Sequence, residues 1–434
     1  MMPETTYPGP QTIKRHVLDS GIVLLVYHNP TVASVVVEGL VRAGALAESD
    51  EQAGLASYVA EMLTRGTANR SFEQIYEEIE AVGASLDFGS GRHTTEFSAR
   101  GLAEDIDLLL ELLADCLENP TFPEKQLEAV RGEILTDLQM RANDTRRMAG
   151  LAFRELVYRG HPYGQSVDGY DETVQSLTRE DLQSFHERYY GPREMILTVV
   201  GAVDEDRLLG RVESAFGGWT TNQKPLPDLP PAVRPLTTLR TQVEMPEKSQ
   251  SDIVLGLPGP RRSAPDYLEA SMANTILGVF GMYGRLGKSV REEQGLAYYA
   301  FSRLQGGLGP GPWYVSTGVA PGNVEQAINS IRAEIDRLQN EPIPTEELAD
   351  SQAYRTGSMP VSLETNSGLA AVITDMEKFG LGLDYLQTLP DRIASMTPES
   401  VQEAAQKYLS SEQIAIAVAG PPAPPPSGEA TVEA

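Results

Sequence analysis

The sequence predicts an α+β protein built from two tandem homologous domains, each a mainly antiparallel sheet packed with helices. Three features of the 434-residue chain support this prediction. Strand-like and helix-like patterns alternate along the first half, a segment from the middle of the chain recurs near its end, and a proline-rich stretch lies between the two copies. Because the chain is too long for one ordinary hydrophobic core, two or more domains are expected.

The first half opens with a predicted hairpin, in which Asp19, Ser20 and Gly21 form the turn between two β-favouring runs over residues 13–26. A third strand is expected at 33–43, and residues 84–100 alternate like strands. Helical spacing marks 54–64, 71–82, 105–117 and 124–141. Ser71 and Gln74 have the spacing of a capping box. The pattern indicates a largely antiparallel sheet with helices.

The internal repeat pairs residues 176–201 with residues 395–420, without a gap. Matching positions include Ser176 with Ser395, Thr178 with Thr397, Gln183 with Gln402, Tyr189 with Tyr408 and Gly201 with Gly420. Each copy reads as a capped helix, a short turn and a final strand. We therefore predict homologous domains at 12–222 and 241–420, a proline-rich linker at 223–240 and a disordered tail at 421–434.

Composition excludes several classes of function. The composition, with 41% apolar and 22% charged residues, is typical of a soluble globular protein. The formal net charge of -26 argues against nucleic acid or an anionic membrane as partner. No run is long enough to cross a bilayer, so the cytoplasm is the expected compartment. Cys116 is the only cysteine, which excludes an internal disulfide or a cysteine-based zinc site.

Common catalytic motifs are missing. The five histidines are scattered along the chain, so no pair has the close spacing of zinc ligands on one element. There is no G-x-S-x-G elbow. Gly287-Lys288-Ser289 matches only the end of a phosphate-binding loop, and we attribute that match to chance because no buried strand leads into it.

The glycine-rich stretch 278–303 carries the most distinctive chemistry. Its glycines at 278, 281, 284, 287 and 295 allow sharp turns and close approach of another chain. Arg291 and Tyr298 are donors suited to a carbonyl or carboxylate oxygen, and Gly295 predicts that Tyr298 starts a strand after a break. From these residues alone, an arginine paired with a nearby glutamate beside a core tyrosine remains the alternative.

Several segments together resemble the pitrilysin/insulinase family of zinc peptidases, whose motif is an inverted H-x-x-E-H. The segment 54–67, GLASYVAEMLTRGT, is similar to the motif helix of that family with its flanks. Further similar segments are Ser90–Phe97, Asn119-Pro120, His161-Pro162-Tyr163-Gly164, Tyr189-Tyr190-Gly191-Pro192 and the glycine-rich stretch. The resemblance spans about residues 12 to 420 and implies the family's tandem α+β domains.

The metal-binding motif itself is degenerate. Ser57 stands at the first zinc-binding histidine, Ala60 at the catalytic glutamate and Glu61 at the second histidine, while the third ligand of the family falls near Asp137. Two carboxylates without imidazole are a poor zinc site, and Ala60 cannot act on a metal-bound water. We expect no metal on this chain.

The resemblance also assigns a role to the second domain. Arg291 and Tyr298 stand at the positions of a family arginine and tyrosine that bind the substrate backbone opposite the zinc. The chain therefore resembles the non-metal subunit of a heterodimeric peptidase, whose related partner of similar length supplies H-x-x-E-H and zinc. This subunit would be inactive alone and would bind peptide substrate through Arg291 and Tyr298.

Three alternatives stay open. The chain could be a structural subunit, like the core subunits that the family contributes to respiratory complexes, with an incidental Arg/Tyr pair. It could be a peptide-binding homodimer without a catalytic partner. An independent hydrolase that uses Glu61 and Asp137 with another metal is the weakest alternative.

Overall fold

The computed structural model describes residues 7–279 and 284–422, and every structural statement below concerns these residues. Gly281 and most of the predicted tail lie outside them. The chain divides into two compact units, each described by itself. Unit 1 comprises Met1–Leu138, Gln165–Leu229 and Thr356–Arg392, and unit 2 comprises Gln139–Gly164, Pro230–Arg355 and Ile393–Ala434.

Unit 1 contains a six-stranded sheet in the order β1-β2-β6-β3-β5-β4. The strands are β1 (Ile13–Val17), β2 (Val23–His28), β3 (Ser34–Val41), β4 (Ser85–Ser90), β5 (Thr95–Leu102) and β6 (Ile196–Gly201). The predicted hairpin is confirmed, since Ile13 pairs with Tyr27 and Val17 with Val23. Only β2 and β6 pair in parallel, so the mainly antiparallel sheet is confirmed as well.

Helices cover both faces of this sheet, as strand alternation requires. Val35, Val37 and Val199 point into a core shared with helices of the first half of the chain. Those helices are α1 (Leu55–Met62), α2 (Phe72–Ala81), α3 (Ile106–Glu118), α7 (Arg179–Tyr189) and α8 (Glu205–Phe216). Thr198 points the other way and bonds with Thr374 of α12 (Asn366–Lys378), 2.7 Å apart. The sheet is therefore buried on both sides.

Unit 2 contains a five-stranded sheet in the order β7-β11-β8-β10-β9. Its strands are β7 (Leu239–Glu244), β8 (Ser251–Pro258), β9 (Ala297–Leu304), β10 (Pro312–Val319) and β11 (Ala415–Gly420). Contacting helices include α5 (Thr145–Val157), α9 (Tyr267–Asn274) and α10 (Val324–Asn340), and α14 (Pro398–Tyr408) packs on α9 and α10. Two π-helices, η5 (Thr275–Val279) and η7 (Gly287–Glu293), pack against β9.

The remaining helices connect these elements. They are α4 (Glu124–Ala142), α6 (Asp171–Ser176), α11 (Thr345–Ser362), α13 (Tyr385–Ala394) and the short 3-10 helices η1 (Ala45–Ala47), η2 (Asp50–Gln52), η3 (Ala103–Asp105), η4 (Pro162–Gly164) and η8 (Pro321–Asn323). No helix in the described part of the chain is both long and apolar enough to span a membrane.

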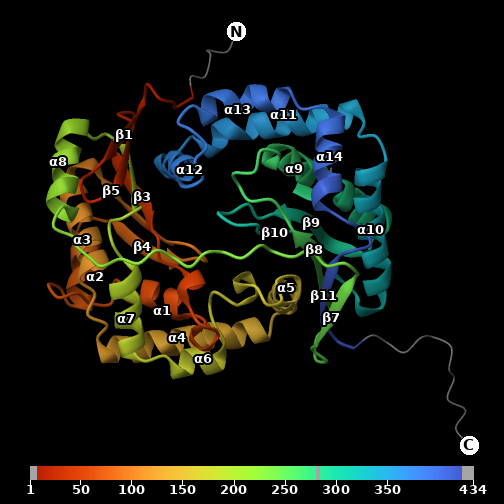
Figure 1. Ribbon diagram of the computed structural model, residues 1–434, viewed down its shortest axis with the longest axis horizontal. Helices are drawn as coiled ribbons and strands as arrows, with labels where there is room; N and C mark the ends of the chain where they lie inside the picture. Colours follow the sequence, from red (N-terminus) through yellow and green to blue (C-terminus); the bar gives the residue numbers. More distant parts are fainter. Residues whose placement is uncertain (1–6, 280–283, 423–434) are drawn as a thin grey trace, which may run out of the picture. The chain divides into compact units, whose positions relative to one another are not determined.

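Each sheet receives one helix from the other half of the sequence. Helix α5 lies in the first half of the sequence but packs on β7, β8 and β11, whereas α12 lies in the second half but packs on β3 and β6. Figure 1 shows α12, drawn in blue, beside the red strand β3. The two compact units consequently cut across the sequence domains predicted at 12–222 and 241–420.

The predicted internal repeat has the same structure in both copies. Each copy forms a helix, α7 or α14, with a capping box at Thr178 or Thr397, followed by a fully buried strand, β6 or β11. Both strands end at a glycine with nearly equal φ, 157° at Gly201 and 159° at Gly420. The residues of the predicted linker that precede β7 form no helix or strand.

Candidate functional site

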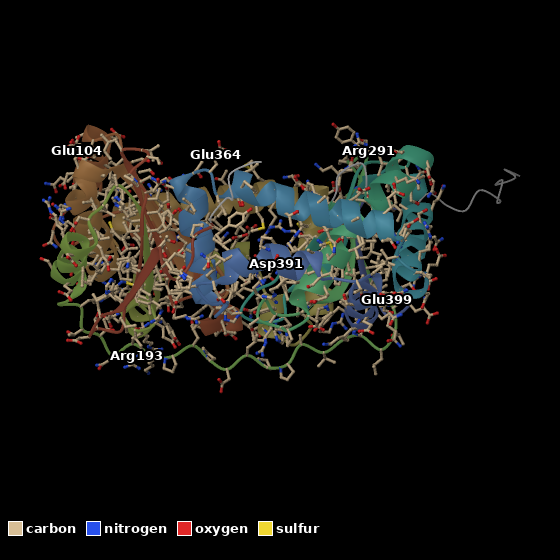
Figure 2. The ribbon with its side chains drawn as sticks, turned by 90° about the horizontal axis from the view of Figure 1, so that it is seen from above. Glu104, Arg193, Arg291, Glu364, Asp391 and Glu399 are labelled. Atoms are coloured by element: carbon tan, nitrogen blue, oxygen red, sulfur yellow. The ribbon has the colours of Figure 1, made fainter. Side chains whose placement is uncertain are left out.

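Arg291 and Tyr298 lie together on the surface of unit 2. Arg291 belongs to η7, and Tyr298 is the second residue of β9, as the break at Gly295 predicted. The guanidinium carbon of Arg291 lies 5.5 Å from the centre of the Tyr298 ring, within the range of a cation–π contact. Figure 2 shows Arg291 at the outer surface. The structure thus places the two predicted site residues in contact with each other.

Both side chains are available to a ligand. Tyr298 is 85% exposed, although a large aromatic side chain usually contributes to a core. Arg291 is exposed too, and no carboxylate of the described residues pairs with it, even though Glu292 and Glu293 follow it directly. The alternative of an arginine paired with a nearby glutamate beside a buried tyrosine therefore does not describe this pair.

Two glycines shape the segment that carries the pair. Gly295 has φ +60°, a value that side-chain-bearing residues rarely adopt, and it separates η7 from β9. A Cβ added to Gly278 would lie 2.6 Å from the backbone nitrogen of Ser302 in β9. A close approach thus occurs at Gly278, but the approaching segment is the chain's own strand β9 and not another chain.

A buried aspartate holds the start of β9. Asp252 of β8, 1% exposed, accepts hydrogen bonds from the Tyr299 hydroxyl, from Thr145 of α5 and from Gln250. The Arg146 guanidinium lies 4.8 Å from the centre of the Tyr299 ring. Burial and the Asp252 carboxylate raise the pKa of Tyr299, so this tyrosine stays a neutral donor. These contacts fix the strand next to Tyr298.

The degenerate motif lies on α1 in unit 1, beside α4. Ser57 is partly buried, Ala60 is 2% exposed in the core and Glu61 is exposed. The Tyr58 hydroxyl donates to the Leu127 carbonyl of α4 at 2.5 Å. The methyl group of Ala60 offers neither a ligand nor a base, so the helix has kept its packing without the chemistry of the motif.

An arginine and a second glutamate lie near Glu61. Arg65, one turn further along the chain, forms an ion pair with Glu133 of α4 at 3.0 Å. Although Glu61 as a whole is exposed, partial desolvation of its carboxyl group raises its pKa and the Glu133 carboxylate adds to this rise, while Arg65 lowers that pKa. Asp137 is exposed one turn after Glu133. The charged groups next to Glu61 are therefore the side chains of Arg65 and Glu133.

The residues present do not fit zinc. Over residues 7–279 and 284–422, no group of three or more His, Cys, Asp and Glu side chains could hold a metal ion. Four histidine rings form hydrogen bonds with other groups: His16 with Glu205, His28 with the Val203 carbonyl, His161 with the Pro230 carbonyl and His186 with the Leu117 carbonyl. His93 has an interaction as well. No chemical step on this chain can be built on a metal at Ser57, Ala60 and Glu61.

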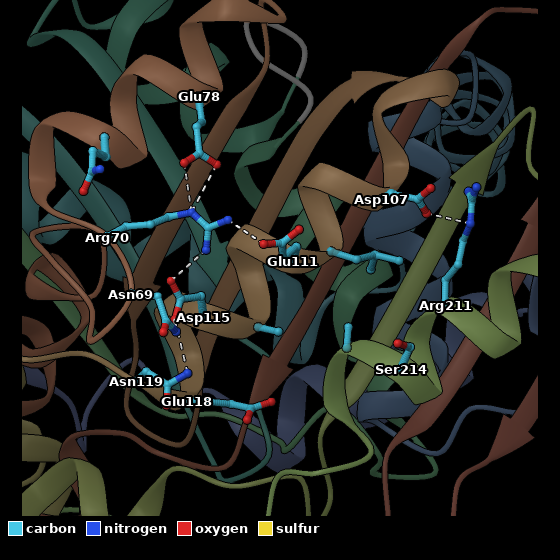
Figure 3. Close-up of a pocket in the computed structure, with 14 residues that line it drawn as sticks. Asn69, Arg70, Glu78, Asp107, Glu111, Asp115, Glu118, Asn119, Arg211 and Ser214 are labelled. Atoms are coloured by element: carbon cyan, nitrogen blue, oxygen red, sulfur yellow. Dashed lines mark hydrogen bonds and ion pairs between the residues drawn. The ribbon is translucent and has the colours of Figure 1, made fainter.

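A polar hollow in unit 1 is lined by a structural network of charged side chains. A cavity of about 780 Å³ between α2, α3 and α8 contains Arg70, whose guanidinium bonds to Glu78, Glu111 and Asp115 (Figure 3). Asp115 also accepts from Thr67 at 2.7 Å and from Asn119. The network joins Gly66-Thr67 to Asn119-Pro120, two segments that the sequence resemblance had singled out.

Some residues at these sites escaped the sequence analysis. Glu48 accepts from the backbone nitrogens of Gly54 and Ala56 at 3.0 and 2.6 Å and so caps α1, although burial raises its pKa to about 8. No local pattern marks this cap. Arg65 lies just beyond the end of α1, only four residues after Glu61, so its proximity to Glu61 could have been expected from the sequence.

Models of one protein family match most of the chain. The model of the insulinase family, peptidase family M16, matches residues 23–169, and the model of the peptidase M16 inactive domain matches residues 176–354. An uncharacterized zinc protease of Streptomyces coelicolor is 27% identical over 417 residues, which cover 95% of this chain and 90% of that protein. The β subunit of the mitochondrial-processing peptidase of Saccharomyces cerevisiae is 26% identical over 383 residues, covering 85% and 81% of the two chains.

Solved structures share the fold. The peptidase M16 inactive domain from Pseudomonas fluorescens superposes with a TM-score of 0.88 at 23% identity, covering 94% of this chain and 98% of that one. A protease from Helicobacter pylori also gives a TM-score of 0.88, at 19% identity, and covers 96% and 100%. At these identities the superpositions establish the fold alone.

Proposed function

Since the chain belongs to the insulinase family of peptidases, peptidase family M16, we propose that it is the non-metal subunit of a heterodimeric zinc-dependent peptidase. Its first family domain lacks the metal ligands, with Ser57, Ala60 and Glu61 in their places. Its second keeps an exposed arginine and tyrosine in contact. A site with substrate-binding donors and no metal is half of an active site.

Arg291 and Tyr298 bind and orient the peptide in this proposal. The Arg291 guanidinium holds a peptide carbonyl or carboxylate by charge-assisted hydrogen bonds. The Tyr298 hydroxyl donates to the scissile carbonyl oxygen as it gains negative charge, which can contribute about 2.7–4 kcal/mol for a single donor. The cation–π contact keeps the two donors directed at neighbouring oxygens of one peptide.

The partner supplies what this chain lacks. It is a related chain of similar length that carries H-x-x-E-H, and its zinc and general base act on the water that attacks the peptide. It also binds the peptide as an added strand at a sheet edge. We expect the complex to work in the cytoplasm, and its ligand is a peptide, with no role for nucleic acid or a membrane.

One observation carries the proposal: Arg291 has no acidic partner among the described residues and lies over an 85% exposed tyrosine. In a purely structural subunit, an unpaired arginine and an exposed aromatic ring would have no reason to be held together. The same pair would suit a peptide-binding homodimer, which is the second candidate. The mass and composition of the native complex separate these two candidates.

The test of the site is a pair of conservative substitutions in the complex with the zinc-bearing partner. Arg291→Lys keeps the charge but loses the planar fork, and Tyr298→Phe loses only the hydroxyl. We expect Tyr298→Phe to lower kcat about 100-fold or more, consistent with the loss of one oxyanion donor, and Arg291→Lys to raise KM. Peptide cleavage by the purified complex is the measurement.

Two matched controls accompany this experiment. Arg303→Lys changes a different exposed arginine, which lies in β9. Tyr76→Phe removes the hydroxyl of an exposed tyrosine in unit 1. Both controls should leave cleavage unchanged, and all four variants should still assemble. Unchanged cleavage in Arg291→Lys and Tyr298→Phe, with the complex intact, would refute the assignment.

A further inference from the structure

Gln294 connects the segment that carries Arg291 to helix α10. Its side-chain nitrogen donates to the Ser289 hydroxyl at 3.2 Å, and its side-chain oxygen accepts from the Ser330 hydroxyl at 2.9 Å and from the Gln326 amide at 3.4 Å. Ser289 lies in η7, whereas Ser330 and Gln326 lie on α10. One amide therefore ties the π-helix to its neighbour.

The place of Gln294 in the chain makes this tie relevant to the candidate site. Gln294 follows the last residue of η7, three residues after Arg291 and four before Tyr298. The adjacent Gly295 has φ +60°, and a Cβ added to it would meet no other atom within 4 Å. Packing against neighbouring side chains therefore does not hold the turn at that point. The Leu296 amide donates to the Val290 carbonyl at 3.0 Å and closes the turn.

The side of η7 that faces α10 and α11 is not closely packed. A hollow of about 440 Å³ separates Arg285, Lys288, Ser289 and Glu293 from residues of α10, α11 and the loop between them. At the start of η7, Arg285 crosses to α11 through two bonds to Glu347, at 2.9 and 2.7 Å. Just after its end, the side-chain amide of Gln294 forms hydrogen bonds with α10.

We propose that Gln294 is a positioning residue for the Arg291–Tyr298 pair, an inference that rests on the function proposed above. A π-helix is an uncommon and locally irregular element that needs tertiary support. Arg291 has no ion pair among the described residues, so the backbone of η7 sets its position. Gln294 anchors that backbone at the end nearest the pair, and its loss would let the guanidinium move off the Tyr298 ring.

The first experiment measures the pair in this chain alone, without a partner or a substrate. Position 298 carries 3-fluorotyrosine, and the ¹⁹F chemical shift is recorded for the otherwise unchanged chain, for Gln294→Met and for Arg291→Ala. Methionine has nearly the length of glutamine but makes none of the three hydrogen bonds. We expect Gln294→Met to move the signal towards that of Arg291→Ala. A signal identical to the unchanged chain would overturn the inference.

The second experiment measures peptide cleavage by the complex with the zinc-bearing partner. Because small displacements of positioning groups are costly, Gln294→Met should lower kcat/KM about 10-fold. Ser330→Ala removes the partner on α10 and should act in the same direction, and the double variant should be no worse than Gln294→Met, since both changes break one connection. Fully additive effects would indicate that Gln294 does not act through α10 and would overturn the inference.

The two experiments keep this inference separate from the proposed function. If the fluorine signal moves in Gln294→Met while Arg291→Lys leaves cleavage unchanged, the anchor is real and the proposed function fails. If Arg291→Lys impairs cleavage while Gln294→Met changes neither readout, the function stands and the positioning role is overturned. Gln183→Met, on α7 of unit 1, is the control and should change neither readout.

Discussion

At the scale of single residues, Glu61 lies near an ion pair and not in a group of metal-binding side chains of the described residues. Arg65 lies beside Glu61 and pairs with Glu133, so a positive charge already occupies the surroundings of this carboxylate. A zinc ion brought to the same place would find carboxylates but no imidazole.

His186 gives unit 1 a pH-dependent stability. Its ring stacks on Tyr190 and bonds to the Leu117 carbonyl at 2.8 Å, and burial lowers its pKa to about 4. Because the ordinary pKa is about 6.5, the unfolded chain takes up the proton first as the pH falls. The contribution of His186 is therefore complete above about pH 6.5 and is lost progressively towards pH 4.

His186→Gln should flatten this dependence. Between pH 7.5 and pH 5 the unchanged protein should lose about 2 kcal/mol more unfolding free energy than the variant, because the neutral amide takes up no proton. Urea unfolding of both proteins at the two pH values checks the difference, and Gln183→Ala on the same helix is the control. An equal loss in both proteins would show that the ring is not buried in its neutral form.

Residue-level prediction succeeded where the signal was local. Gly295 predicted the break before Tyr298, and the family resemblance singled out Arg291 and Tyr298, which the structure holds in contact. Gln294 was visible in the same run of sequence, but its partners on α10 are more than thirty positions away. A hydrogen bond between segments so far apart leaves no pattern along the chain.

At the scale of elements, α5 and α12 each pack on the sheet built mainly from the other half of the sequence, and we call them the exchanged helices. The two helices are anchored in similar ways. The first residue of α5, Thr145, donates to Asp252 in β8. The first residue of α12, Asn366, donates to the Ser34 carbonyl in β3 at 3.0 Å. Each helix thus begins with a bond to the first or second residue of a central strand, and each has a side-chain cap one residue earlier.

Separated halves of the chain should not fold alone. Residues 1–226 lack α12 over the sheet of unit 1, and residues 227–434 lack α5 over the sheet of unit 2. Each half would expose a sheet face that is buried in the intact protein. We expect strong binding of a hydrophobic dye and self-association for either half, and a soluble complex when both are produced together. Light scattering and dye fluorescence provide the measurement.

A cut made after folding is the control for this experiment. A protease site inserted in the linker between residues 226 and 227 should leave the two fragments associated after cleavage, because the exchanged helices already hold them. A half that is monomeric and unfolds cooperatively by itself would contradict the requirement for exchange.

The exchange also marks the limit of prediction for elements. The Asp19-Ser20-Gly21 turn and the capping box at Ser71 and Gln74 were recognised because their signals lie within a few residues. The repeat predicted matching strands at β6 and β11. Which sheet α5 or α12 covers depends on packing between distant segments, and an amphipathic helix has the same pattern on either sheet.

At the scale of the whole molecule, the two family domains have diverged in what they retain. In the proposed assignment the first has Ala60 at the position of the catalytic carboxylate, and the second has Arg291 and Tyr298 exposed and in contact. This division makes sense if a second chain contributes the complementary half. The account therefore depends on the existence of a zinc-bearing partner.

The most direct measurement is the composition of the native complex. The tagged chain is purified under mild conditions from its natural source, and the complex is analysed by native mass spectrometry, zinc content and peptidase activity with and without a chelator. We predict a heterodimer with a related chain of similar length that carries H-x-x-E-H, one zinc per complex, and activity lost on chelation. A homodimer without zinc and without peptidase activity would contradict the account.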